Sequence, residues 1–450
     1  MQELEIKRAM ALAEKDFSYN LANTVGDYRE SWRIFRIMAE FVEGYQFLSQ
    51  LKNEVTILGS ARLSEKTSYY QTARKLGELL GKSGFTVITG GGPGIMEAAN
   101  RGAFEAGGES IGLNIQLPFE QRVNPYVKKS IAFYYFFTRK VMLTSPANAF
   151  AYFPGGFGTL DEFFEIVDLM ELNKMQKTPV VLVGKDFWNP LLDFLRQHSC
   201  PLGSVSPALI DHWSVVDTAE EAWELIKDTK DRANLCELSP QTFSGKDKMD
   251  WKIFRIMAEL VEGFDFLTGL SDDVTVLGTK SVKSDSPIYA SAYNLGRSLA
   301  QAGYAAITGG GPGIMEAVNK GAFEAGGESI GINMRYGHKE RVNPYVRRSI
   351  GFQFPYTRKL VITAPSKAFV FYPGGFGTLH QLFEVLTLIQ TKKIKKMPVI
   401  LYNHEFWTPL HKFIKTMMVH QLETVSNEDD ELYQIVDDEE AVMKIIKGAG

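Results

Sequence analysis

GGGPGIMEA at Gly90–Ala98 and PGGFGTL at Pro154–Leu160 each occur twice in this chain. They return as Gly309–Ala317 and Pro373–Leu379, so both are displaced by the same interval (309 − 90 = 219 and 373 − 154 = 219). One constant offset means that the chain holds two gap-free copies of a single unit. The sequence therefore predicts a tandem duplication.

The length of 450 residues fits two domains of this kind. We predict a helical N-terminal extension at 1–30, a first domain at 31–230, a linker at 231–248 and a second domain at 249–450. The linker assignment depends on Ser239-Pro240 and Ser244-Gly245, which are turn-forming pairs.

The composition is that of an ordinary globular protein, with 45% hydrophobic and 23% charged residues. A net charge of −4 gives no reason to expect nucleic acid or an anionic membrane as partner. The two cysteines, Cys200 and Cys236, form no CxxC pair, which argues for a reducing compartment and against a metal site. The sequence shows neither a signal peptide nor an apolar run of about 20 residues, so we expect a cytoplasmic protein.

Each half alternates apolar runs with segments of helical spacing, which is typical of an α/β fold with a parallel sheet covered on both faces. In the first half we predict strands at 55–58, 85–89, 110–115, 149–153 and 179–183, helices at 69–82 and 95–105, and a further helix opened by 155–159. The segment from Trp32 to Leu48, which returns from Trp251, has helical spacing and predicts an amphipathic helix.

Both glycine-rich segments are expected to join a strand to a helix, at the sheet edge where open α/β folds bind ligands. Backbone N–H groups and the helix dipole bind phosphate at such turns. The candidate phosphate or substrate contacts are Gly91, Gly92, Gly94, Gly155, Gly156, Phe157, Gly158 and Thr159. Neither segment is a P-loop or a complete GxGxxG, and a tight strand–helix connection is the structural alternative.

Thr159 and Glu162 form the T-x-x-E pattern of a capping box. The second copy has Gln381 in place of this glutamate, after Thr378. Glutamine caps a helix as well as glutamate does, but it carries no charge and exchanges no proton. A capping role predicts two equally functional halves, whereas a chemical role predicts an inactive second half.

Arg139 and Lys140 form a TRK motif that returns at Arg358-Lys359. Such a pair is often solvated on a helix surface, but its recurrence beside apolar sequence favours contact with an anion or substrate. The polar loop 118–126 precedes the motif and could cover the site, with Glu120 as a candidate contact.

The positions of the histidines limit which residues can act as a base in the first half. All seven lie at or after His198, so the first half has no local histidine base near its glycine loops. His380, beside the second PGGFGTL, is expected to be a solvated helix residue. No HExxH, Cys/His cluster or GxSxG is present.

In this order, the motifs resemble the Lonely Guy (LOG) family, formerly described as lysine decarboxylases. Its hallmark PGGxGTxxE is matched by Pro154–Glu162, and the resemblance spans residues 32–230 and 251–445. It implies a Rossmann-like doubly wound sheet and hydrolysis of the N-glycosidic bond of a nucleoside 5′-monophosphate, without a cofactor or metal. It also implies catalytic roles for Glu162 and Arg139. Because family members are commonly dimers, the two copies resemble a fused pseudo-dimer, which could assemble further into a homo-oligomer.

Two departures from the family pattern bear on function. Gln381 replaces the motif glutamate, and the threonine found six residues further on in the family is Asp168 in the first half and Thr387 in the second. A nucleotide-binding regulator without turnover therefore stays open as an alternative. A decarboxylase using a Schiff base between Lys140 and pyridoxal phosphate is a second alternative.

Overall fold

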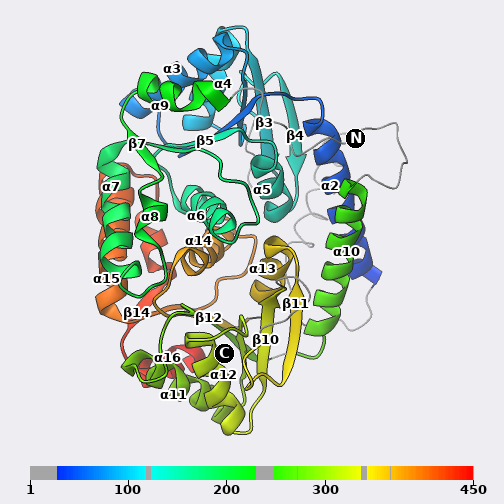
Figure 1. Ribbon diagram of the computed structural model, residues 1–450, viewed down its shortest axis with the longest axis vertical. Helices are drawn as coiled ribbons and strands as arrows, with labels where there is room; N and C mark the ends of the chain where they lie inside the picture. Colours follow the sequence, from blue (N-terminus) through cyan, green and yellow to red (C-terminus); the bar gives the residue numbers. More distant parts are fainter. Residues whose placement is uncertain are drawn as a thin grey trace, which may run out of the picture.

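The computed structural model describes residues 28–117, 123–229, 248–270, 272–335, 342–364 and 366–448. In this part of the chain two seven-stranded sheets form, and the strand pairs within each are parallel. Figure 1 shows one sheet with its helices above and the other below. The α/β class and the tandem duplication are confirmed. Most of the predicted extension and of the predicted linker lies outside the described residues.

The first domain runs from α2 to η2. Its strands are β1 (Glu54–Leu58), β2 (Thr86–Thr89), β3 (Glu109–Ile115), β4 (Lys129–Phe133), β5 (Ala149–Tyr152), β6 (Val180–Val183) and β7 (Ser214–Val216). Its helices are α2 (Tyr28–Leu48), α3 (Ser68–Lys82), α4 (Ile95–Glu105), α5 (Phe136–Thr144), α6 (Phe157–Glu171), α7 (Lys185–Phe194), η1 (Leu195–Ser199), α8 (Pro207–Ile210), α9 (Ala219–Ile226) and η2 (Lys227–Thr229).

The second domain repeats this order from α10 to α16. Its strands are β8 (Asp273–Leu277), β9 (Ala305–Thr308), β10 (Ser329–Met334), β11 (Arg348–Phe352), β12 (Ala368–Phe371), β13 (Val399–Tyr402) and β14 (Gln434–Val436). Its helices are α10 (Lys248–Leu267), α11 (Pro287–Gln301), α12 (Ile314–Glu324), α13 (Pro355–Thr363), α14 (Phe376–Gln390), α15 (His404–Phe413), η3 (Ile414–Gln421), η4 (Asn427–Leu432) and α16 (Glu439–Gly448).

The strand order explains where a ligand can enter each sheet. It is β4-β3-β2-β1-β5-β6-β7 in the first domain and β11-β10-β9-β8-β12-β13-β14 in the second. From β1 the chain adds β2 to β4 on one side of the sheet and then β5 to β7 on the other, so the switch point lies between β1 and β5. The same switch occurs between β8 and β12, as in a doubly wound Rossmann-like fold. Crevices form at such switch points, at the carboxyl ends of the strands. Both glycine-rich loops of each domain follow strands at this edge.

The local predictions agree well with the elements. The five predicted strands and two predicted helices of the first domain lie within one residue of the observed ends. The strand β4 was not predicted, because residues Lys129–Phe133 are mostly exposed at the sheet edge and form no continuous apolar run.

The two domains pack through α6 and α14, which lie together in the centre of Figure 1. Phe164 and Phe383 are equivalent residues of the two copies, and their rings stack with centroids 5.6 Å apart. Phe157 contacts Phe383 with centroids 6.0 Å apart, and Phe376 contacts Phe164 in the equivalent pair at 6.4 Å. A surface that meets its own copy in this way is that of a twofold dimer. The chain is a fused pseudo-dimer.

Apolar side chains from both domains join in one continuous core around this contact. On one side of the molecule α2 and α10 also contact each other (Figure 1). Among the described residues no helix is both long enough and apolar enough to span a lipid bilayer.

Candidate active site

The start of α6 differs from the capping pattern that its sequence suggested. The helix begins at Phe157, with Gly156 as N-cap, and no side chain caps it. The Thr159 N–H donates to the Gly156 carbonyl at 3.1 Å, within the first turn. The structural alternative of a capping box between Thr159 and Glu162 is therefore not observed, because the helix already starts before the threonine. The Glu162 side chain has no role as a cap.

Glu162 instead faces Arg139, which α5 supplies. Arg139 Nη1 lies 3.6 Å from Glu162 Oε1, and the two side chains are 10% and 13% exposed. The Arg139 Nε donates to the Leu113 carbonyl at 2.8 Å, which fixes the guanidinium plane. Burial raises the pKa of Glu162 above its ordinary value, and the opposing charge of Arg139 lowers it by a smaller amount.

The Arg139 guanidinium lies between Glu162 and the first glycine loop. A Cβ atom placed on Gly90 would lie 2.4 Å from Arg139 Nη2, so any larger residue would displace the arginine. The second loop, which ends at the N-terminus of α6, lies one turn before Glu162. The structure thus brings Arg139 next to Glu162 and to the first loop, while a shared role of these residues in binding or catalysis stays a prediction.

Asn124 holds the first loop in shape. Its Nδ2 donates to the carbonyls of Gly91 at 3.1 Å and Gly92 at 3.0 Å. Gly91 and Gly94 both have φ of +69°, which favours glycine, and a Cβ on Gly94 would meet the Ser60 carbonyl at 2.3 Å. Sequence reasoning treated the segment around Asn124 only as a cover, although its exact return at Asn343 was a signal for a structural role.

The second loop is flanked by the other domain. Thr424 Oγ1 donates to the Gly155 carbonyl at 3.1 Å, and a Cβ on Gly156 would lie 2.9 Å from the Thr424 carbonyl. A Cβ on Gly158 would lie 3.8 Å from Thr387 Cγ2. The Phe157 ring is fully buried in the domain contact, so only its backbone can reach a ligand. Residues of the second domain therefore flank the second glycine loop of the first domain.

Lys140 lies in the contact between the domains. Its Nζ is 2.7 Å from Asp161 and 3.4 Å from Glu384 of the second domain, and its side chain is 3% exposed. Burial alone would lower the pKa of Lys140, but Asp161 and Glu384 reverse this, so the pKa is raised. The solvated alternative for the Arg139-Lys140 pair is excluded, because both side chains are buried. Substrate contact by Lys140 stays a prediction, while Glu120 lies outside the described residues.

His380 corrects another expectation. It is fully buried rather than solvated, its Nδ1 contacts the Lys359 ammonium, and its Nε2 lies 3.2 Å from Asp161 Oδ1. An ammonium can only donate, so Nδ1 accepts and the ring proton is on Nε2, which lies near Asp161 without forming a hydrogen bond in the described part of the chain. Burial and then Lys359 lower the pKa of His380 well below 6.5, so the ring is neutral. The sequence missed this because His380 occupies the place of Asp161 in the second copy, inside the pseudo-dimer contact.

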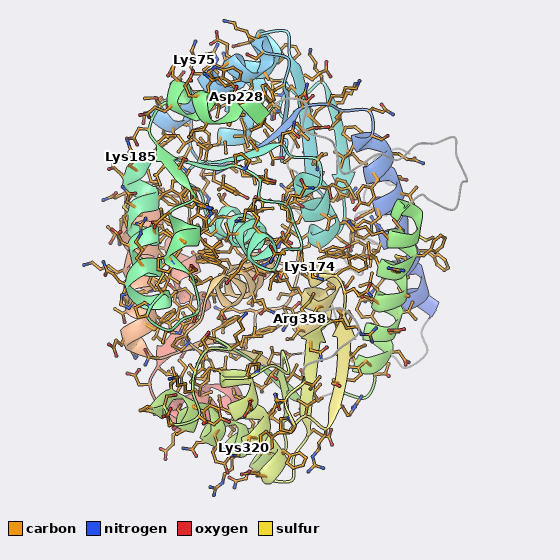
Figure 2. All side chains as sticks on the ribbon, in the orientation of Figure 1. Lys75, Lys174, Lys185, Asp228, Lys320 and Arg358 are labelled. Carbon is orange, nitrogen blue, oxygen red and sulfur yellow. The ribbon has the colours of Figure 1, made fainter. Side chains whose placement is uncertain are left out.

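The second domain repeats the arrangement with one chemical change. Arg358 Nε donates to the Ile332 carbonyl at 2.8 Å, as Arg139 does to Leu113. Figure 2 shows Arg358 close to the middle of the molecule, whereas Lys75 and Lys320 lie towards its outer ends. Gln381 stands where the first domain has Glu162. In the described part of the chain, the second domain's own residues therefore lack a counterpart of the Glu162 carboxylate, although Asp168 and Glu171 of α6 reach this crevice from the first domain.

These features define a class of α/β protein with glycine-rich loops at the switch point of each sheet and a buried glutamate–arginine pair beside those of the first domain. A family model described as "possible lysine decarboxylase" matches residues 96–226 and 315–446, more than half of the chain. The chain belongs to this family, which is the LOG family that its motifs resemble.

Curated relatives match single copies of the repeat. A cytokinin riboside 5′-monophosphate phosphoribohydrolase of Rhodococcoides fascians is 26% identical over 157 residues, which are 34% of this chain and 79% of that protein. The rice protein of that name (LOG; Oryza sativa subsp. japonica) is 32% identical over 151 residues, 33% of this chain and 61% of its own. Its relative LOG3 of Arabidopsis thaliana is 28% identical over 212 residues, covering 46% and 93%.

Two of the similar solved structures each cover about one copy. A molybdenum cofactor binding protein from Rippkaea orientalis is 23% identical, with a TM-score of 0.31, covering 39% of this chain and 96% of that one. The molybdenum cofactor carrier protein of Chlamydomonas reinhardtii is 24% identical, with a TM-score of 0.30, covering 40% and 98%. Similarity at this level says nothing about what this chain binds.

Proposed function

We propose that this protein hydrolyses the N-glycosidic bond of nucleoside 5′-monophosphates in its first domain, releasing the free base and ribose 5-phosphate. The observation that carries the proposal is the pairing of Glu162 with Arg139 between the two glycine loops. The phosphoribohydrolase names of the relatives support the same reaction class.

The reaction needs a group that stabilises positive charge on the sugar. As the bond to the base breaks, its electron pair leaves with the base, and C1′ of the ribose becomes cationic until the oxygen of water bonds to it. The proton lost by water balances the charge on the departing base. A fixed carboxylate beside C1′ stabilises the cation and orients the water, and this is the role that we assign to Glu162.

The phosphate would be bound one turn earlier in the chain. The N–H groups of the loop Gly155–Gly158 and the N-terminus of α6 supply partial positive charge, and no acidic residue lies in the first turn of the helix. Arg139 either holds the phosphate or assists the departing base. Both roles place its guanidinium within reach of substrate and Glu162.

The alternative of a pyridoxal phosphate decarboxylase has less support. A Schiff base requires a neutral lysine amine, but Lys140 is paired with two carboxylates and its pKa is raised. The alternative of a nucleotide-binding regulator without turnover is tested by the experiment that follows, which measures whether free base is released.

The test is release of free base from AMP, CMP and GMP, measured by chromatography, for the wild type and Glu162→Gln. We expect base from at least one nucleotide, and a loss of about 10²–10³-fold in turnover in the variant with its fold retained. Glu224→Gln, which changes an exposed carboxylate on α9, is the matched control and should keep full turnover.

Two results would contradict the proposal. Full turnover by Glu162→Gln would remove this residue from the chemistry. Absence of base release from all three nucleotides, with binding retained, would favour the regulator.

A further inference from the structure

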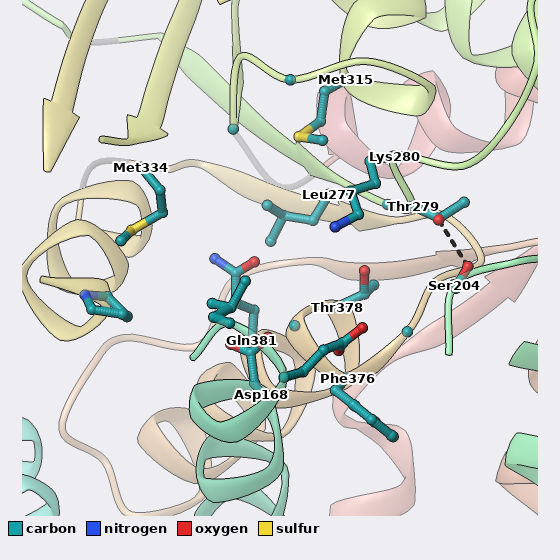
Figure 3. Close-up of a pocket in the computed structure, with 18 of the residues that line it drawn as sticks. Asp168, Ser204, Leu277, Thr279, Lys280, Met315, Met334, Phe376, Thr378 and Gln381 are labelled. Atoms are coloured by element: carbon teal, nitrogen blue, oxygen red, sulfur yellow. Dashed lines mark hydrogen bonds between the residues drawn. The ribbon is translucent and has the colours of Figure 1, made fainter. Parts of the chain in front are cut away.

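The second domain contains a large cavity at its own switch point. Its volume is about 520 Å³, within the range of small-molecule sites. Its lining includes the loop residues Gly309, Gly311 and Gly375–Thr378, together with Arg358 and Gln381. The first domain supplies the rest of the wall, through Asp168, Glu171 and Leu172 of α6 and Ser204. Figure 3 shows Gln381 and Asp168 close together on one side of this cavity, opposite Met315 and Lys280.

Two buried polar side chains that line this cavity have hydrogen-bonding groups without a partner in the described part of the chain. They are Nε2 of Gln381, which is 4% exposed, and both amide atoms of Asn333, which is 3% exposed. Buried polar groups normally have partners, because leaving them unsatisfied costs free energy. Unsatisfied donors and an acceptor on residues that line a cavity of this size indicate a polar ligand.

The cavity wall carries the cations Lys280, Arg358 and Lys359 and the carboxylates Asp168 and Glu171, and Asp168 is paired with Lys359. The remaining positive charge favours an anionic end on that ligand. The N-terminus of α14 opens at this cavity with Gly375 as N-cap and without an acidic residue in its first turn. Arg358, the counterpart of Arg139 in the second copy, lines the cavity. Lys280 adds a cation at a position where the first domain has Ala61.

We propose that this cavity of the second domain binds a nucleoside 5′-monophosphate without hydrolysing it. The glycine loop and Lys280 hold the phosphate, while the amides of Gln381 and Asn333 bond to the nucleoside. Hydrolysis does not follow, because the Gln381 amide carries no charge to stabilise a ribose cation. The choice of ligand rests on the proposed function of the first domain.

The two sites share one helix. Glu162 lies near the start of α6, and Asp168 and Glu171 lie on the same helix in the wall of the second cavity. A Cβ on Gly377, at the second loop, would lie 3.1 Å from Asp168 Oδ1, so the loop and α6 are in close contact. A ligand in the second cavity therefore touches the helix that carries the proposed catalytic carboxylate.

The experiment counts binding sites in the full chain by calorimetry with AMP, CMP and GMP, in a Glu162→Gln background that suppresses turnover. We expect two sites per chain. Adding Lys280→Glu should weaken one of them by tenfold or more, because the new carboxylate repels the phosphate. Thr159→Val, which follows the second glycine loop of the first domain, should weaken the other. Lys283→Glu, an exposed lysine outside the cavity lining, is the matched control for Lys280→Glu.

The outcomes separate this proposal from the function of the first domain. The proposal would be overturned by a single site whose affinity Lys280→Glu leaves unchanged, by two sites whose affinities are both unchanged in Lys280→Glu, or by no binding at all. A single site that Lys280→Glu weakens would support it, and would at the same time contradict substrate binding in the first domain. Release of base by the wild type tests the first-domain proposal independently.

Discussion

At the scale of single residues, the two copies differ most informatively at Glu162 and Gln381. Both follow a threonine by three residues, and a sequence pattern alone cannot tell a cap from a catalyst. In the structure, Gly156 and Gly375 are the N-caps and neither has a side-chain cap. The difference between carboxylate and amide therefore has no consequence for capping. Its consequence is the loss of one negative charge from the second crevice.

The pH dependence of turnover follows from the surroundings of Glu162. The reaction needs its ionised form, so kcat/KM should fall on the acid side with a pKa above the ordinary value of 4.5, because burial raises the pKa. Arg139 lowers this pKa, so Arg139→Met should move the acid limb to higher pH as well as reducing turnover.

The measurement is kcat/KM for base release across the acid range. Arg196→Met, at an exposed arginine paired with Asp193 and Asp211, is the control and should leave the limb in place. If the acid-side fall in kcat/KM of Arg139→Met occurs at the same pH as in the wild type, or at lower pH, ionisation of Glu162 does not determine it.

At the scale of elements, α5, α6 and α14 meet in a buried ionic cluster. Lys140 from α5 pairs with Asp161 at the start of α6 and with Glu384 from α14. In the equivalent position of the second copy, Lys359 pairs with Asp168 at 2.9 Å and contacts His380. Buried charges of this kind depend on each other, because removing one leaves its partner unpaired in a low-dielectric environment.

We expect Lys140→Met to lower the free energy of unfolding by about 3–5 kcal/mol, because Asp161 and Glu384 lose their common cation. The double variant Lys140→Met, Asp161→Asn should lose less unfolding free energy than Lys140→Met, because the carboxylate left unpaired by the lysine substitution is also removed. Denaturant unfolding measures both.

The matched control is Lys185→Met, which removes an exposed pair with Asp217 and should cost about 0–1 kcal/mol. Equal losses for Lys140→Met and Lys185→Met would mean that the buried cluster contributes no more than a surface ion pair.

At the scale of the whole molecule, neither domain is complete by itself. Thr424 of the second domain bonds to the Gly155 carbonyl, and Ser199 of the first bonds to the Gly374 carbonyl at 3.0 Å. The stacked Phe164 and Phe383 would both be exposed if the halves separated. The interface therefore stabilises the apolar core and the phosphate-type loops together.

Chains divided into residues 1–247 and 248–450 should consequently associate one to one when they are produced together. The first half alone should lose most of its turnover, because the flank of its second loop is missing. Light scattering after size exclusion, together with base release, tests this. A first half that is monomeric and fully active would show that the second domain does not complete the site.

Much of this architecture could be predicted from the sequence, because its signals are local or repeat at one fixed interval. Apolar runs such as Val55–Leu58 predict buried strands, and the glycine loops mark the strand–helix turns at the ligand-binding edge. The constant offset of the motifs revealed two copies, and the exchange of Glu162 for Gln381 showed where their chemistry differs.

Other features were decided only by tertiary structure. The pairing of Glu162 with Arg139 in place of a cap, the burial of His380 against Asp161 and the pairing of Lys140 with Glu384 have no signal in any local pattern. The last two join residues more than 200 positions apart in the sequence. Their energies depend on desolvation and on charges brought together by packing, which a chain acquires only once its two halves have met.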